Sequence, residues 1–119
     1  MNSELGFNAY VLLGNALNYL VNGAHIDSGA ELNAPAAAIT SLYRRIEPLN
    51  PTQVLPAVAE LSPDERSLLD RCCRYCLRAL DQGDVPSILG LPWEVAQDVL
   101  TQLALERPPN RTTPDSRAL

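Results

Sequence analysis

Residues 5–26 contain no Asp, Glu, Lys or Arg, whereas asparagine recurs through them at Asn8, Asn15, Asn18 and Asn22. An uncharged run of this length could serve as a signal peptide or as a membrane span. A signal peptide needs a basic segment before its apolar core, and Glu4 stands where Lys or Arg would be expected. A membrane span would carry four side-chain amides into hydrocarbon at a cost in free energy. We therefore expect neither, and predict a helix whose polar surface is asparagine.

The spacing of apolar residues in this run predicts an amphipathic helix over residues 3–22. One wide apolar face is expected to pack into the core, and a narrow, mostly polar stripe lies opposite. A flank of apolar and small residues lies between them. The wide face comprises Leu5, Ala9, Leu12, Leu13, Ala16 and Leu20; the stripe comprises Glu4, Asn8, Val11, Asn15, Asn18 and Asn22; the flank comprises Phe7, Tyr10, Gly14 and Val21.

A loop over residues 25–33 is expected to precede two shorter helices. The first covers residues 34–46, with Asn33 as its N-cap. The second lies within residues 50–61 and is short, with Pro56 near its start, because proline disrupts the interior of a longer helix.

The strongest helix start in the chain is Ser62-Pro63-Asp64-Glu65, which combines an N-cap serine, proline in the first turn and glutamate at the third position. This helix is expected to end at Gly83. A turn at residues 85–90 and a last helix over residues 92–106 follow. On the long helix, the expected apolar side is Leu69, Cys72, Cys73, Cys76 and Leu80, and the expected solvated side is Arg66, Asp70, Arg74 and Arg78.

The chain has 119 residues, enough for one domain, and its hydrophobic content of 46% is too high for a disordered protein. No segment shows the alternation of apolar and polar residues that is typical of a β-strand. We therefore predict an all-α fold, a single compact bundle of four to six helices over residues 1–106, followed by a disordered, Pro-rich tail over residues 107–119.

Charge and cysteine content restrict the environment and the partners. The net charge is −5, which repels phosphate backbones, so we expect no direct binding to nucleic acid. The three cysteines are an odd number and lie within five residues of sequence, which suits a reducing compartment better than a disulfide framework. These features predict a cytoplasmic protein that does not bind membranes.

No segment resembles a catalytic motif, and we expect the protein not to be an enzyme. Cys72, Cys73 and Cys76 include a C-x-x-C spacing, but a structural zinc site needs ligands from a second segment, and His25 is the only histidine. The cysteines are better explained as small buried apolar side chains. His25 follows the end of a predicted helix and has no nucleophile beside it. We predict no metal and no cofactor.

The arginines of the long helix allow two interpretations. Arg71, Arg74 and Arg78 could present guanidinium groups to an acidic partner. They could equally form an ordinary solvated face, in which Asp70 and Arg74 pair at i, i+4. The second interpretation is preferred, because charged residues on a helix are usually its solvent-facing side.

The segment from Leu61 resembles the C-terminal helix-turn-helix of LuxR-type transcription factors. Leu61-Ser62-Pro63-Asp64-Glu65 matches the opening cap of that family in kind, and Leu89-Gly90-Leu91-Pro92 matches its corner. The similarity covers about a third of the chain, and the spacing between Gly83 and Gly90 is shorter than in the family. The residues that would face the major groove are Trp93, Glu94, Gln97, Asp98, Thr101 and Gln102. They include two acidic side chains and neither Arg nor Lys, so this resemblance implies a contact with protein rather than DNA.

The uncharged helix has two interpretations. It could be a central core helix, enclosed on most sides and showing its asparagines to water. It could instead be an interface, because interfaces deplete charge at their centre and enrich aromatic residues. The predicted partner-binding residues are Phe7, Asn8, Tyr10, Val11, Gly14, Asn15, Asn18 and Val21.

The chain length, the uncharged first helix and the segment DERSLLDRCCRYCLRAL are similar to those of the small Pseudomonas quorum-sensing antiactivators. This resemblance implies a small regulator that covers the dimerisation surface of a LuxR-type transcription factor and so prevents DNA binding. A homodimer is also expected. The alternatives are an inhibitor of the phage or toxin-immunity kind and a degenerate helix-turn-helix protein that assists DNA binding.

Overall fold

The computed structural model describes residues 3–23 and 27–105, which form seven α-helices and one π-helical turn, with no strand among them. The predicted all-α class is confirmed. The helix count exceeds the expected four to six because part of the expected loop after the first helix is itself helical. The elements are α1 (Ser3–Asn18), the π-helical turn η1 (Tyr19–Gly23), α2 (Ser28–Leu32), α3 (Ala36–Ile46), α4 (Pro51–Ala59), α5 (Pro63–Ala79), α6 (Val85–Leu89) and α7 (Trp93–Leu103).

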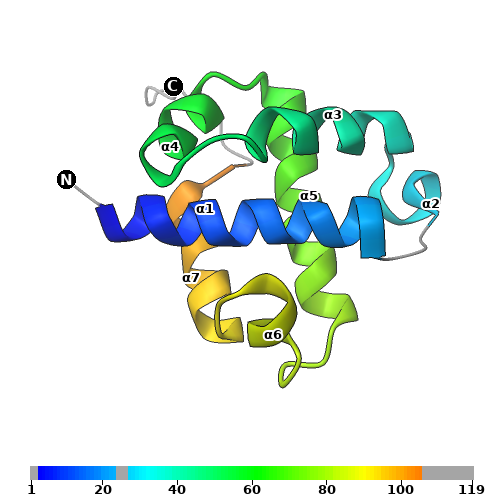
Figure 1. The fold of residues 1–119 in the computed structure, drawn as a ribbon. Coiled ribbons are helices and arrows are strands. Elements are labelled where there is room, and N and C mark those ends of the chain that lie inside the picture. Colours follow the sequence, from blue (N-terminus) through cyan, green and yellow to red (C-terminus); the bar gives the residue numbers. More distant parts are fainter. Residues whose placement is uncertain (1–2, 24–26, 106–119) are drawn as a thin grey trace, which may run out of the picture.

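Helix α1 runs through the middle of the domain (Figure 1). Helices α3 and α4 lie along one side of it, α6 and α7 lie along the other, and α5 crosses behind it. The fully buried side chains of α1 are Ala9, Leu12, Leu13, Ala16 and Leu17. The domain therefore encloses α1 on most sides, as expected of a core helix, and leaves one side of it open.

Helix α5 is the longest in the structure, and its start is the capping box expected from the sequence. The Ser62 hydroxyl accepts from the backbone N–H of Glu65 at 3.1 Å, and the Glu65 carboxylate accepts from the N–H of Ser62 at 2.9 Å. The helix ends at Ala79, with Leu80 as its C-cap, and so stops before the predicted Gly83. Its apolar side contains Leu69 and the three cysteines, all fully buried.

Two residues assigned to the solvated side of this helix are buried. Arg66 is 4% exposed and Asp70 is 1% exposed, so the expectation of a solvent-facing row was wrong at these positions. The reason is tertiary: the segment after α7 returns over the start of α5, where the Leu105 carbonyl accepts from Arg66 Nε at 3.4 Å. The Asp70 carboxylate accepts from Arg74 Nε at 3.0 Å, which compensates its burial.

The region between α1 and α5 differs from the prediction in local detail. Residues Ser28–Leu32 form α2, where a loop was expected. Asn33 does not cap α3, because it adopts a left-handed conformation with φ 55°, and Pro35 occupies the N-cap position without a side-chain bond. Pro56 lies well inside α4 rather than near its start. The helix continues past Pro56, and an Asn50–Gln53 capping box satisfies N–H groups at its start.

Within the described residues, no helix is both long and apolar enough to cross a membrane. The predicted loop residue His25 and the predicted tail over residues 107–119 lie outside the described part of the chain.

Candidate protein-binding face

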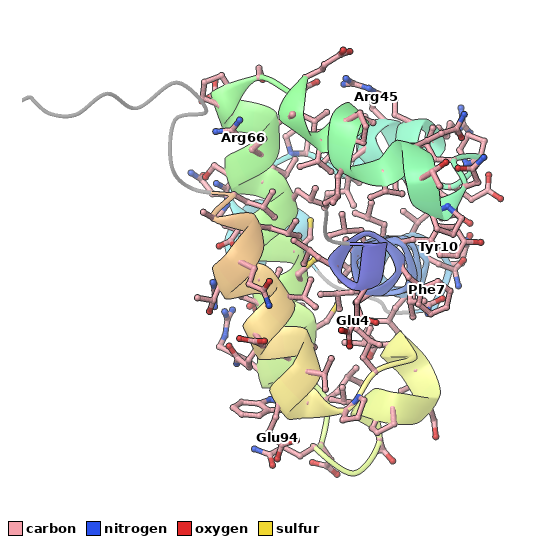
Figure 2. The ribbon with its side chains drawn as sticks, turned by 90° about the vertical axis from the view of Figure 1, so that its left-hand side faces the viewer. Glu4, Phe7, Tyr10, Arg45, Arg66 and Glu94 are labelled. Atoms are coloured by element: carbon pink, nitrogen blue, oxygen red, sulfur yellow. The ribbon has the colours of Figure 1, made fainter. Side chains whose placement is uncertain are left out.

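The side of α1 that other helices leave uncovered carries two adjacent aromatic rings. Phe7 is 53% exposed and Tyr10 is 37% exposed, and they are the large apolar side chains that the described residues expose. Their ring centroids lie 6.2 Å apart with the planes tilted by 38°. Both side chains point outward between α4 and α6 (Figure 2). We call the surface formed by Phe7, Tyr10, Gly14 and Asn18 the aromatic face.

An open hollow of about 260 Å³ adjoins the aromatic face. Gly14 lies in it, and a β-carbon added there would meet no atom within 4 Å, so the backbone of α1 is open to a partner at this point. Asn18 Oδ1 accepts from the Tyr43 hydroxyl at 3.3 Å and from Asn22 Nδ2 at 2.8 Å. The hollow is lined by Tyr10, Val11, Gly14, Asn15, Asn18, Tyr43 and Glu47.

Sequence reasoning missed Tyr43 and Glu47 as parts of this surface. Both follow from the fold, since α3 packs alongside α1 and its last turn reaches the hollow. A hydrogen bond over 25 positions of sequence, from Tyr43 to Asn18, leaves no periodic signal in the sequence.

Two predicted partner-binding residues, Val11 and Asn15, hold α6 in place. Asn15 Nδ2 donates to the Leu89 carbonyl at 3.0 Å. A β-carbon added at Gly90 would lie 2.5 Å from Val11 Cγ1 and 2.8 Å from Asn15 Nδ2. Each side chain is half-buried. Their main contribution is therefore to pack α6 on α1, and only their edges reach the hollow.

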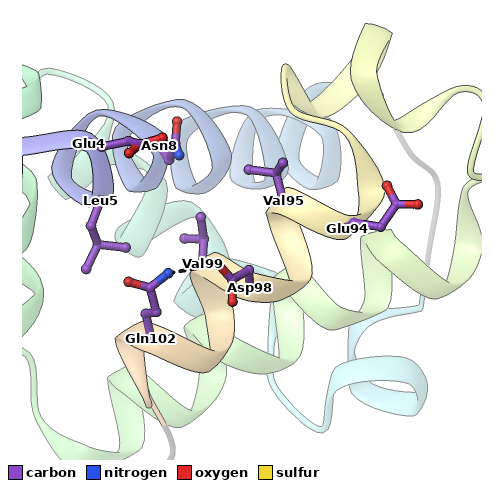
Figure 3. Close-up of a pocket in the computed structure, with 8 residues that line it drawn as sticks. All are labelled: Glu4, Leu5, Asn8, Glu94, Val95, Asp98, Val99 and Gln102. Atoms are coloured by element: carbon purple, nitrogen blue, oxygen red, sulfur yellow. Dashed lines mark hydrogen bonds between the residues drawn. The ribbon is translucent and has the colours of Figure 1, made fainter.

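The remaining two predicted residues, Asn8 and Val21, do not line this hollow. Val21 is half-buried in the π-helical turn. Asn8 lines a different cleft, of about 570 Å³, between the start of α1 and α7 (Figure 3). Of the eight predicted residues, Phe7, Tyr10, Gly14 and Asn18 are thus brought together on one open surface.

The cleft beside Asn8 is acidic. Glu4, Glu94 and Asp98 line it, and none of them pairs with a basic side chain among the described residues. Gln102 Nε2 donates to Asp98 at 3.0 Å (Figure 3). Glu94 and Asp98 belong to α7, the helix that the LuxR-type resemblance would place in a DNA groove, and their charge would repel phosphate.

The arginines of α5 are mostly engaged within the chain. Arg71 Nε donates to the Leu32 carbonyl at 2.9 Å, and Arg71 also donates to the Ser67 hydroxyl at 2.7 Å. Arg74 pairs with Asp70, and the Arg78 guanidinium lies 5.7 Å from the centre of the Tyr75 ring. An acidic partner would have to compete with these contacts, which disfavours the arginine row as a docking site.

The cysteines are three free thiols inside the core. Burial raises the pKa of Cys72 and of Cys76 to about 12, and it raises the pKa of Cys73 well above its ordinary value. Within residues 3–23 and 27–105, no three His, Cys, Asp or Glu side chains are grouped so that they could hold a metal ion.

Comparison with protein-family models, with curated proteins and with solved structures finds no match to this chain.

Proposed function

We propose that this protein is a non-enzymatic regulator that binds another protein through the aromatic face of α1. The single observation that carries the proposal is the position of Phe7 and Tyr10, whose rings are exposed side by side on a helix that the domain encloses on most other sides. Exposing these rings to water has a free-energy cost that burial against a partner would recover. Aromatic anchors surrounded by uncharged side chains are typical of the energetic centre of an interface.

The surroundings of the two rings favour a helical or otherwise convex protein segment as the ligand. Gly14 leaves room for close approach, and the amide of Asn18 and the hydroxyl of Tyr43 can form hydrogen bonds without the desolvation cost of a charge. The hollow of about 260 Å³ beside the rings could receive one side chain of such a segment.

The partner class that we propose is the ligand-binding domain of a LuxR-type transcription factor. Its support is the resemblance in sequence to the quorum-sensing antiactivators. In this mechanism the aromatic face covers the surface through which the factor dimerises. A factor that must be dimeric to hold its DNA site then dissociates from it.

A gel-shift titration tests both parts of the proposal. Purified chain is added to a LuxR-type regulator bound to its DNA site, and we expect the shifted band to disappear as the chain approaches stoichiometric excess. Phe7→Glu replaces an exposed ring of the face with a charge and should weaken the effect at least tenfold. Thr101→Glu, a change to an exposed position on α7, should not. Circular dichroism confirms that both variants are folded.

Two outcomes would contradict the proposal. Binding to the regulator that is equally strong with Phe7→Glu would exclude the aromatic face. A shift of free DNA by the chain alone at low salt would instead indicate a nucleic-acid-binding accessory protein. If the regulator is unaffected, an affinity-tagged chain and its Phe7→Glu variant can be compared in a bacterial lysate by mass spectrometry.

A further inference from the structure

We infer that the aromatic face also pairs with the same face of a second copy of the chain, in an antiparallel arrangement that places Phe7 of each copy at Gly14 of the other. This inference rests on the face assigned in the proposed function and names a second occupant for it. Three observations support it: the spacing of the two residues, the volume of the hollow, and the distribution of charge.

Phe7 and Gly14 are seven residues apart, which places them two turns apart on nearly the same side of α1. The separation along the helix axis is about 10.5 Å at 1.5 Å per residue. Consider a two-fold axis perpendicular to α1 at the level between Tyr10 and Val11. It places Phe7 of each copy opposite Gly14 of the other copy, so the same contact forms twice. A projecting ring and an open backbone position at this spacing are therefore self-complementary, which is the requirement for a symmetric interface.

The hollow has room for the ring that this arrangement brings to it. Its volume of about 260 Å³ exceeds the roughly 150 Å³ of a protein cavity that accommodates benzene. Gly14 contributes no side chain to fill the hollow, and its added β-carbon would find empty space. The Phe7 side chain is the most exposed large apolar group among the described residues. Burying it would therefore remove more apolar surface from water than burying any other single side chain of the aromatic face.

The charge distribution favours this face over the others for self-association. Two chains of net charge −5 repel each other, and a contact through the acidic cleft beside α7 would bring further carboxylates together. Phe7, Tyr10, Gly14 and Asn18 carry no charge, and Glu47 is the charged residue that lines the hollow. Because salt screens the net repulsion, we expect the dimer to become tighter as ionic strength rises.

Self-pairing and partner binding would use the same surface, so they would exclude each other. The chain would then hold its apolar face covered at high concentration and expose it on dissociation. A regulator of this kind responds to its own concentration as well as to that of its partner.

The oligomeric state is the test, measured by light scattering and sedimentation equilibrium over about 1–300 µM, a span that covers weak and moderate dimers. The wild-type chain should shift from monomer to dimer. Gly14→Arg should weaken the dimer at least tenfold and should not lower the melting temperature, since an added β-carbon meets no atom and glycine disfavours helix. Thr101→Arg adds the same charge on α7 and should leave the dimer unchanged.

Disulfide trapping tests the orientation. A mixture of Phe7→Cys and Gly14→Cys chains should form mixed cross-linked dimers under mild oxidation, and Gly14→Cys alone should not, because the two Gly14 positions are separated by about 10.5 Å along the paired helices. The buried native cysteines are a constant background.

A wild-type chain that stays monomeric at the highest concentration overturns the inference, as does Gly14→Arg dimerising as tightly as wild type. Cross-linking of Gly14→Cys with itself overturns the antiparallel arrangement. These failures are distinguishable from failure of the proposed function. If the chain is monomeric but still displaces the regulator from DNA in a Phe7-dependent manner, only the dimer is refuted. If the chain dimerises but never affects the regulator, only the proposed function is refuted.

Discussion

The side-chain amide of Asn15 donates a hydrogen bond to the main-chain carbonyl of Leu89 at 3.0 Å, across 74 positions of sequence. This bond joins the middle of α1 to the end of α6, next to Gly90, which turns the chain toward α7 with φ +84°. An asparagine that looks like part of a solvent-facing stripe in the sequence is thus a tertiary anchor. It also fixes the lower border of the aromatic face, because α6 is held where it leaves Phe7 and Tyr10 open.

Gly90→Ala should be strongly destabilising. The added β-carbon would lie 2.5 Å from Val11 Cγ1, and the left-handed backbone disfavours any residue with a side chain. Backbone strain and overpacking together should lower the free energy of unfolding by about 2–4 kcal/mol. Urea denaturation measures the loss. Gly83→Ala is the matched control, since no atom lies within 4 Å of its added β-carbon, and equal losses in the two variants would refute the role of close packing at Gly90.

Ser62→Ala should remove the N-cap of α5. The Ser62 hydroxyl accepts from the N–H of Glu65, and without it that donor is left to water. The expected loss in the free energy of unfolding is about 1 kcal/mol, the usual value for such a cap. Thermal or urea unfolding provides the measurement. Ser41→Ala, at an exposed position within α3, should change stability little, and a similar loss there would mean that capping is not the cause.

Glu65 should make stability depend on pH in the acid range. The hydrogen bond from the Ser62 backbone N–H holds the pKa of Glu65 below its ordinary value of 4.5, opposed by slight desolvation and assisted by Arg45. The ionised carboxylate therefore stabilises the folded state above pH 4.5, and this contribution is lost as the pH falls through the lower folded pKa.

Glu65→Gln isolates this charge, because glutamine can still complete the capping box. The free energy of unfolding should differ between wild type and Glu65→Gln at pH 7, and the difference should shrink by pH 3. A difference that is constant over this range would show that the carboxylate is not responsible.

The three cysteines should be unreactive in the folded protein. Burial raises the pKa of Cys72 and Cys76 to about 12, so almost no thiolate is present at pH 8 to attack a disulfide reagent. We expect no labelling by an aromatic disulfide reagent over minutes in buffer and labelling of all three thiols in denaturant. Rapid labelling of a native thiol would mean that α5 opens or that the core is loosely packed.

Local signals determined much of the secondary structure. The Ser62–Glu65 capping box and the apolar period of residues 3–22 each depend on neighbours within one or two turns, so a single sequence carries them completely. The failures have tertiary causes. Asn33 is a good N-cap residue in isolation, yet the chain uses it as a left-handed turn after α2. The burial of Arg66 depends on where Leu105 returns, 39 positions later.

The candidate site was predicted in part for the same reason. Helical periodicity predicted an uncharged surface on the first helix that spans a flank and a polar stripe, and the structure brings Phe7, Tyr10 and Gly14 of the flank together with Asn18 of the stripe. Periodicity gives only the angle of each residue around the helix. It does not say which angles neighbouring helices cover, so Val11, Asn15 and Asn8 could not be separated from the open residues.

The sequence by itself determined that this chain is helical, where its longest helix begins, and that its first helix has no charged face. Only the tertiary structure decided that five helices surround α1, that α6 covers Val11 and Asn15, and that a strip around Phe7 and Tyr10 is left open. The physical reason is the distance along the sequence over which the deciding interactions act. Capping and periodicity arise from contacts within a few residues, whereas the exposure of a side chain depends on every segment that packs against its helix.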